Sequence, residues 1–258
     1  MKTLNSLFIS AILFTIYSAV LYADKVNNDL AIKANQDGNY TQALEYSLKA
    51  FEIDSKKNKS DTNITIAIDL NNIAYFYEKL EKYTEALDYY ERSLKIKEKK
   101  YGKPSKDLTI SYNNIASLYD KRKEYKKAIE YYKKAIKAYE VLLTSGHVYF
   151  IITYEDIALD YMKLKDYKNS LEYYLKALQN KEKILPITHP KLFETYTHVA
   201  FLYEKLKQNE KALEYYTTMY KISKKVNGSD DNSTKALEIK VQQLSPKKSV
   251  SNTDRKKP

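Results

Sequence analysis

Residues that carry catalytic or metal-binding chemistry are few in this chain of 258 residues. It has no cysteine, which excludes disulfides, thiolate nucleophiles and cysteine-ligated zinc. Its histidines, His147, His189 and His198, share no helical spacing, and its four glycines are too scattered to form a phosphate-binding loop. The adjacent Glu155 and Asp156 would point about 100° apart on a helix, so they cannot flank one substrate atom. We therefore expect no enzyme activity, no cofactor and no metal site.

Pairs of asparagines are the other polar residues whose spacing indicates a role, and that role is binding. Asn71 and Asn72 recur 42 residues later as Asn113 and Asn114. An amide side chain both donates and accepts hydrogen bonds, so stacked asparagines can bind the backbone of an extended peptide whatever its side chains. Alternatively, they only bridge neighbouring helices or water. Either role requires the two pairs to lie on successive structural units.

Such units are visible as an internal repeat. An alanine recurs at spacings of 43, 42, 42 and 42 residues, at Ala31, Ala74, Ala116, Ala158 and Ala200. Twelve residues after each of them stands a second small residue: Ala43, Ala86, Ala128, Ser170 and Ala212. Aromatic pairs follow at Tyr89-Tyr90, Tyr131-Tyr132, Tyr173-Tyr174 and Tyr215-Tyr216. Five copies in one register indicate a repeat protein.

Each unit has the pattern of two amphipathic helices. In the first helix of one unit, Leu70, Ile73, Ala74 and Tyr77 fall at i, i+3, i+4 and i+7, which is one helical stripe. The small residues allow the helices to approach closely, and we expect the tyrosines to fill the gaps between them. The scarcity of glycine (4) and proline (5) also favours long helices joined by short turns.

The segment from Asn71 to Ile96, NNIAYFYEKLEKYTEALDYYERSLKI, resembles a tetratricopeptide repeat. The 42-residue period and the Asn-Asn-aliphatic-Ala motif are similar to repeats of kinesin light chains and of many bacterial repeat proteins. The resemblance covers residues 24–228 and implies an all-α fold, a right-handed α-solenoid of about five helix pairs. The pairs are expected at about 24–59, 61–101, 107–145, 148–185 and 190–227. We expect 229–244 to form a capping helix, because terminal repeats need a polar outer face, and 245–258 to be a disordered basic tail.

The same resemblance implies that the first helix of each pair lines a concave groove. The stripe that is not used for packing within a pair then gives the candidate peptide-binding residues. These are Ile68, Asn71, Asn72, Tyr75, Ile110, Asn113, Asn114, Ile152, Glu155, Asp156, Leu159, His198 and Phe201. Glu194 lies on the same stripe of the last pair. Chaperone-binding members clamp a C-terminal carboxylate with lysine and arginine at heights that here hold isoleucine and asparagine, so we expect no such clamp.

The first 23 residues differ from the rest. Lys2 is the only charge before Asp24, and an apolar run extends from Leu4 to Tyr22. This pattern predicts a secretory signal peptide cleaved after Ala23, and hence an exported protein, periplasmic or secreted. Alternatively, the apolar run at residues 4–22 is nearly long enough to stay as an uncleaved membrane anchor.

The net charge of +11 permits contact with nucleic acid, an anionic membrane or an acidic partner. Lysine and glutamate are interspersed along the helices, however, which is typical of a solvated surface. Most of the 27 tyrosines occupy repeat-fixed packing or turn positions, so base stacking is not needed to explain them. We expect a protein or peptide partner, no nucleic acid, and membrane contact only through the N-terminal segment. The abundance of Lys, Asn, Ile and Tyr is typical of an AT-rich bacterial genome.

The sequence therefore favours an exported scaffold for protein–protein interaction that binds a peptide segment or protein partner through its groove. One alternative is a membrane-anchored assembly protein that associates through the ends of its solenoid. Another is an accessory domain of a multi-protein sensor. The N-terminus of the mature chain distinguishes the first two, whereas the partner and the oligomeric state are not specified by the sequence.

Overall fold

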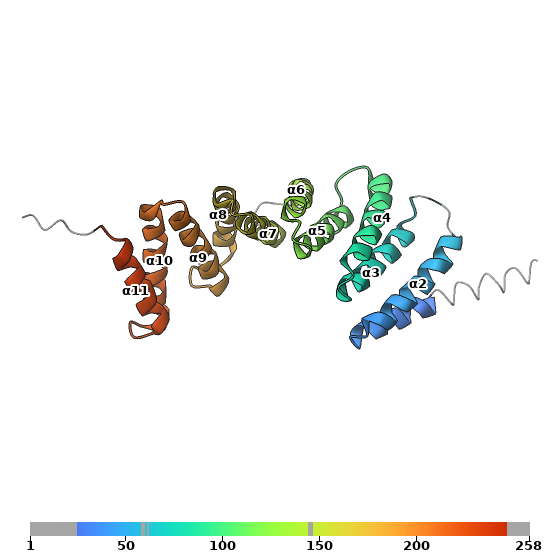
Figure 1. Ribbon diagram of the computed structural model, residues 1–258, viewed down its shortest axis with the longest axis horizontal. Helices are drawn as coiled ribbons and strands as arrows, with labels where there is room; N and C mark the ends of the chain where they lie inside the picture. The colour runs from blue at the N-terminus through green and yellow to red at the C-terminus, as the bar shows by residue number, and fades with distance from the viewer. Residues whose placement is uncertain (1–24, 58–59, 61, 144–146, 247–258) are drawn as a thin grey trace, which may run out of the picture. The chain divides into compact units, whose positions relative to one another are not determined.

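The computed structural model describes residues 25–57, 60, 62–143 and 147–246. These residues form helices joined by short turns, and no strand occurs among them (Figure 1). The chain is helical from 25 to 36. The helices that follow are α2 (Tyr40–Lys57), α3 (Ile64–Lys79), α4 (Tyr83–Tyr101), α5 (Lys106–Lys121), α6 (Tyr125–Leu142), α7 (Val148–Lys163), α8 (Tyr167–Ile184), α9 (Pro190–Lys205), α10 (Asn209–Asn227) and α11 (Asn232–Leu244). The all-α prediction is confirmed.

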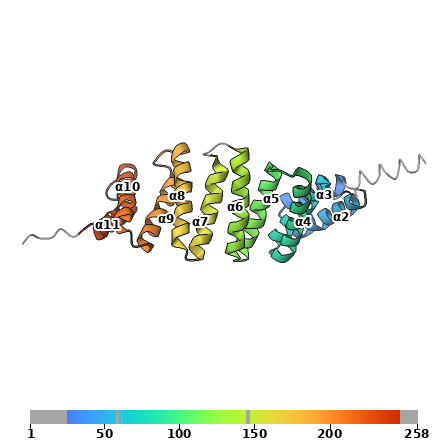
Figure 2. The same ribbon diagram turned by 90° about the horizontal axis from the view of Figure 1, so that it is seen from above.

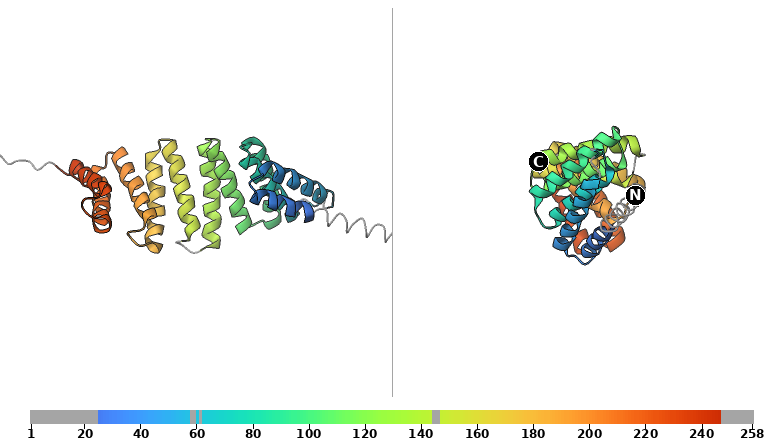
Figure 3. Two further views of the ribbon diagram at one scale, coloured as in Figure 1. Left: turned by 90° about the horizontal axis from the view of Figure 1, so that it is seen from below. Right: turned by 90° about the vertical axis from the view of Figure 1, so that its right-hand side faces the viewer.

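The helices belong to two compact units, residues 1–143 and residues 144–258. In unit 1, α3 packs on α4 and α5 on α6, while α2 contacts α3 and α4 contacts α5. In unit 2, α7 packs on α8 and α9 on α10, while α8 contacts α9 and α10 contacts α11. Figures 2 and 3 show these helix pairs from above and from below. Each helix is stabilised mainly by its neighbours in sequence, as in an α-solenoid.

The residues whose spacing defines the repeat form the cores of the helix pairs. The five first-helix alanines are at most 5% exposed, and the five small residues of the second helices are fully buried. One stacked tyrosine pair recurs with ring centroids 5.4 to 5.7 Å apart: Tyr77–Tyr89, Tyr119–Tyr131, Tyr161–Tyr173 and Tyr203–Tyr215. The expectation that these tyrosines pack between the helices is confirmed.

The turn inside each helix pair contains one residue in the left-handed region. These residues are Gly38, Glu81, Lys123, Lys165 and Lys207, with φ between 58° and 73°. The next amide closes the helix end, as in the 2.9 Å hydrogen bond from Lys82 N to the Tyr77 carbonyl. This conformation costs a residue other than glycine about 1–2 kcal/mol. The turn is therefore the same in all five pairs although only the first pair has a glycine there.

Two of the three histidines begin helices. The Nδ1 atom of His147 accepts a hydrogen bond from Tyr149 N (3.4 Å) at the start of α7. The Nδ1 atom of His189 does the same for Lys191 N (3.2 Å) at the start of α9. Both satisfy a backbone donor that the first helical turn leaves without an intrahelical partner.

The ends of the chain are only partly within the described residues. At the C-terminal end, α11 buries Leu237 and packs Val241 and Leu244 against the core of unit 2. The predicted signal or anchor at 1–23 and the basic tail beyond Pro246 lie outside the described residues. Within the described ranges, no helix has both the length and the apolar character that are needed to cross a bilayer.

Candidate functional site

The candidate residues of unit 1 lie on α3 and α5, the first helices of two successive pairs. Ile68 and Ile110 occupy the same repeat position and are 50% and 44% exposed. Asn72 is exposed, whereas Tyr75 and the other three asparagines are half-buried. We call this set the first-helix face of unit 1: Ile68, Asn71, Asn72, Tyr75, Ile110, Asn113 and Asn114.

The asparagines of this face form some hydrogen bonds inside the fold and leave other hydrogen-bonding groups without a partner. Asn113 Nδ2 donates to the Tyr139 hydroxyl on α6 at 2.6 Å, and Asn114 Nδ2 lies 3.5 Å from Asn71 Oδ1 on α3. These contacts connect neighbouring helices, as one of the two interpretations requires. The Oδ1 atom of Asn113 is nevertheless buried without a hydrogen-bond partner. The face thus retains an acceptor at Asn113 and an exposed amide at Asn72.

The candidate residues of unit 2 lie on α7 and α9, and five of the six line one cavity of about 180 Å³. We call it the acidic cavity: Ile152, Glu155, Asp156, Leu159, Tyr174, Glu194 and His198. Phe201, the sixth candidate, lies outside the cavity lining, 38% exposed, with the Lys205 ammonium 5.0 Å from its ring centroid. Together the cavity and Phe201 form the first-helix face of unit 2.

Two aromatic rings of the acidic cavity stack on each other. Tyr174 of α8 and His198 of α9 have ring centroids 4.7 Å apart and ring planes inclined by 14°. Burial raises the pKa of Tyr174, and the nearby carboxylates Glu155, Glu194 and Asp156 raise it further, so the hydroxyl stays protonated. Burial lowers the pKa of His198, against the opposing effect of Glu194 and Glu155. The imidazole is therefore mostly neutral at pH 7.

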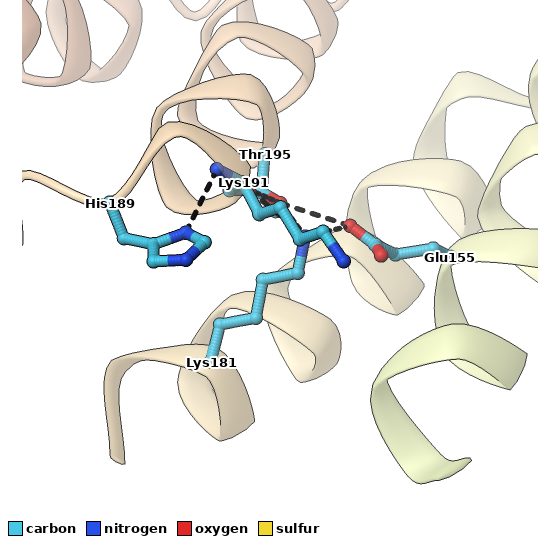
Figure 4. Close-up of polar contacts among 5 residues, drawn as sticks. All are labelled: Glu155, Lys181, His189, Lys191 and Thr195. Carbon is cyan, nitrogen blue, oxygen red and sulfur yellow. Dashed lines mark hydrogen bonds and ion pairs between the residues drawn. The ribbon is translucent and has the colours of Figure 1, made fainter. Parts of the chain in front are cut away.

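A buried lysine fixes one wall of the acidic cavity (Figure 4). Lys181 Nζ on α8 donates to Glu155 Oε1 at 2.5 Å, to Thr195 Oγ1 at 2.7 Å and to the Lys191 carbonyl at 3.0 Å. Thr195 Oγ1 also lies 3.0 Å from Glu155 Oε1. The Lys181 side chain is 5% exposed and that of Glu155 25%. Glu155 is thus positioned by residues of α8 and α9 at once.

The sequence does not distinguish Lys181 or Tyr174 as site residues. Lys181 has the pattern of a charged, solvated helix surface, and Tyr174 belongs to an aromatic pair that packing between helices explains. A signal for Lys181 was present, because one position near the end of every second helix is polar: Asp54, Lys97, Tyr139, Lys181 and Ser223. All five are buried in the structure. A polar residue that recurs at one repeat position therefore marks a buried polar contact here.

The arrangement in both units suits binding. No group of three or more histidine, aspartate or glutamate side chains that could hold a metal ion occurs among the described residues. The faces instead present exposed aliphatic side chains beside amides and carboxylates. Such a mixture buries apolar surface and hydrogen-bonds a ligand at the same time.

The class of the protein follows from this geometry: it is an all-α solenoid of helix pairs. The family model of the tetratricopeptide repeat matches residues 64–140 and 149–225, which is more than half of the chain. The chain therefore belongs to the tetratricopeptide repeat family. Members of this family are generally non-enzymatic scaffolds for protein–protein interaction. No curated protein sequence matches the chain.

Solved structures share the fold. A Podospora anserina protein described as a kinesin light chain with nearly identical TPR-like repeats matches with a TM-score of 0.65 and 19% identity, over 78% of this chain and 95% of its own. BtubC (BKLC) from P. vanneervenii matches with 0.65 and 17% identity, over 87% and 90%. A MamA structure (41-end) from Desulfovibrio magneticus RS-1 matches with 0.58 and 15% identity, over 79% and 97%. At these identities the similarity concerns the fold alone.

Proposed function

We propose that this protein is an exported scaffold, each of whose two units binds an extended segment of a protein partner through its first-helix face. The observation that carries the proposal is a repeated exposed isoleucine. Ile68, Ile110 and Ile152 stand at one repeat position and are 50%, 44% and 49% exposed. Single exposed aliphatic residues are ordinary, but the same one on three successive first helices is a regular apolar feature, and such features mark interaction sites.

Polar groups beside the isoleucines support an extended peptide as the ligand. An extended chain has a backbone donor and a backbone acceptor at every residue, and these must be satisfied when it is buried. In unit 1, Asn72 is exposed and Asn113 retains an unpartnered oxygen. In unit 2, the equivalent positions hold the half-buried carboxylates Asp156 and Glu155. Apolar side chains of the ligand would then cover the isoleucines while its backbone meets these polar groups.

Export is supported by the segment at 1–23, with its single charge at Lys2 and its apolar run. Mass spectrometry of the chain purified from its native cell tests this part. A mature N-terminus at Asp24 supports export through a cleaved signal. Retention of Met1 together with recovery in the membrane fraction would instead favour the anchored form.

Peptide binding is tested with peptides selected by display on the full-length protein. The affinity of a selected peptide is measured for the wild type and for the double variant Ile68→Ser, Ile110→Ser. The control is Val141→Ser, Val226→Ser, because these valines are 69% and 58% exposed on the second helices α6 and α10. We expect the first variant to weaken binding about tenfold or more through lost apolar burial, and the control to leave it unchanged. Equal effects of the two variants, with both folded by circular dichroism, would contradict the proposal.

A further inference from the structure

The acidic cavity of unit 2 contains a buried hydroxyl without a hydrogen-bond partner. Tyr174 is 1% exposed, it lines the cavity, and its hydroxyl oxygen makes no hydrogen bond. Buried tyrosine hydroxyls normally find a partner, because burying one without a hydrogen bond is costly. This hydroxyl therefore marks a position at which a ligand atom can supply the missing contact.

The repeat explains why the partner is missing. The equivalent tyrosines of the second and fifth helix pairs, Tyr90 and Tyr216, donate to Glu78 at 3.0 Å and to Glu204 at 2.8 Å. In the fourth pair, the position of these glutamates is occupied by Met162. A thioether sulfur is only a weak acceptor. The internal acceptor is thus replaced in the one pair whose tyrosine lines the acidic cavity.

The charges of the cavity favour a cation. Among the residues that line the cavity, Glu155, Asp156 and Glu194 bring three carboxylates and none is a lysine or an arginine. Lys181, outside the lining, is paired with Glu155. The mostly neutral His198 adds little positive charge. The cavity therefore keeps an excess of negative charge in a partly buried place, where Coulomb attraction is stronger than in bulk water.

The volume and the lining residues of the cavity favour a side chain with an apolar stem and a planar charged end. The volume of about 180 Å³ compares with roughly 30 Å³ for one water molecule. Ile152 and Leu159 contribute apolar surface that can contact an aliphatic stem. The half-buried ring of His198, which is stacked on Tyr174, offers aromatic surface. Guanidinium groups stack on aromatic rings and have five N–H donors, enough to contact a hydroxyl and two carboxylates together, whereas an ammonium has three donors and no plane.

From this geometry we propose that the acidic cavity holds the side chain of an arginine in the bound segment, an inference that rests on the proposed function. The guanidinium donates to the Tyr174 hydroxyl oxygen and to the carboxylates of Asp156 and Glu194. Its methylene stem lies against Ile152 and Leu159. The partner segment is thus selected at one position by charge and by hydrogen bonding.

Unit 1 lacks this selectivity. The positions of Glu155, Asp156, Glu194 and His198 are occupied there by Asn71, Asn72, Ile110 and Asn114. Its equivalent tyrosine, Tyr90, already has Glu78 as a partner. The face of unit 1 therefore accepts varied side chains, and selection for arginine belongs to unit 2.

The test uses the full-length protein and four peptide libraries. Each library fixes one central residue as arginine, lysine, glutamine or glutamate and mixes the residues around it. We expect the arginine library to bind about tenfold or more tightly than the glutamine library, the gain expected from one charge-assisted hydrogen bond. The double variant Asp156→Asn, Glu194→Gln should abolish this preference, so that the arginine and glutamine libraries bind that variant with equal affinity. Tyr174→Phe should weaken the preference.

Matched controls are Glu214→Gln, which removes an exposed charge of α10, and Tyr90→Phe, which removes the equivalent hydroxyl of unit 1; both should retain the preference. Absence of binding by every library would overturn the proposed function itself. Binding without a preference for arginine, or with lysine equal to arginine, would overturn only the present inference. The same holds for a preference that survives in Asp156→Asn, Glu194→Gln. A preference for arginine that appears only when the chain is truncated after Pro246 would mean that the chain's own basic tail occupies the cavity. That result would overturn the proposal of an arginine from the partner.

Discussion

Three equivalent tyrosines, Tyr90, Tyr174 and Tyr216, should respond differently to the loss of their hydroxyl group. The loss should destabilise the protein at Tyr90 and Tyr216 and stabilise it at Tyr174. Tyr90→Phe removes a hydrogen bond to Glu78, whose side chain is only 14% exposed and keeps its 2.5 Å ion pair with Lys121. Hydrogen bonds to charged groups contribute about 1.5–3 kcal/mol, and the remaining ion pair places the loss near the lower end, about 1.5 kcal/mol. Tyr216→Phe should cost about 1 kcal/mol, since Glu204 is 23% exposed and water can replace part of the bond.

Tyr174→Phe should behave differently, because its hydroxyl is buried without a partner. An uncompensated buried hydroxyl costs about 1–3 kcal/mol, so the substitution should stabilise the free protein by about 1 kcal/mol. The difference between Tyr90→Phe and Tyr174→Phe is then about 2.5 kcal/mol. Urea unfolding followed by circular dichroism measures it, with unchanged slopes taken as the sign that only stability has changed.

The opposite outcome would be a Tyr174→Phe variant that is destabilised as much as Tyr90→Phe. Such a result would mean that the Tyr174 hydroxyl has an acceptor inside the fold. The acidic cavity would then have no polar group waiting for a ligand, and the proposed arginine would lose its strongest argument. A melting temperature raised in Tyr174→Phe and lowered in the other two variants supports the account.

Three further predictions concern the same fold. Lys181→Met should destabilise the protein by about 2 kcal/mol, because it leaves Glu155 without its buried partner. Lys97→Met at the equivalent position removes the 2.9 Å bond to Ser111 and the attraction to Asp107, but burial of the Lys97 charge outweighs that attraction, so this variant should be neutral or stabilising in the same urea assay. Deletion of α11 with the tail should lower the melting temperature because Leu237 no longer covers the core, but deletion beyond residue 246 should not. The pKa of His198 is lowered in the folded state, so the unfolded chain binds the proton more tightly and stability falls as the pH drops below about 6.5. The variant His198→Gln should reduce this loss of stability, which urea unfolding at pH 7.5 and at pH 5.5 would measure.

Much of the fold could be predicted because its packing depends on small residues at a fixed period. Ala74 and Ala116 are fully buried where two helices pack closely. Their 42-residue spacing therefore predicts successive helix pairs that pack in the same way. The left-handed turn residues were not predicted, because lysine and glutamate do not mark that conformation as glycine does. Only Gly38 gives the signal directly.

The helix faces that form the candidate site could be predicted from the sequence, but the buried contacts behind them could not. Helical periodicity places Ile152, Glu155 and His198 on one side of their helices, and the structure brings them to one cavity. Periodicity cannot show that Lys181 reaches inward, because a lysine on a charged helix has the same pattern when it is solvated. Nor does it show that Tyr174 lacks the acceptor that its equivalents have, since this depends on the contact of two helices.

The central claim is that a partner segment binds along the first helices, and photo-crosslinking tests it most directly. A photoreactive phenylalanine is placed singly at Ile110 or Ile152, both on first helices, and at the control positions Val141 or Val226 on second helices. Each full-length variant is irradiated with a display-selected peptide. The account predicts crosslinks from Ile110 and Ile152 and none from Val141 or Val226. Crosslinks from the second-helix positions alone would contradict it.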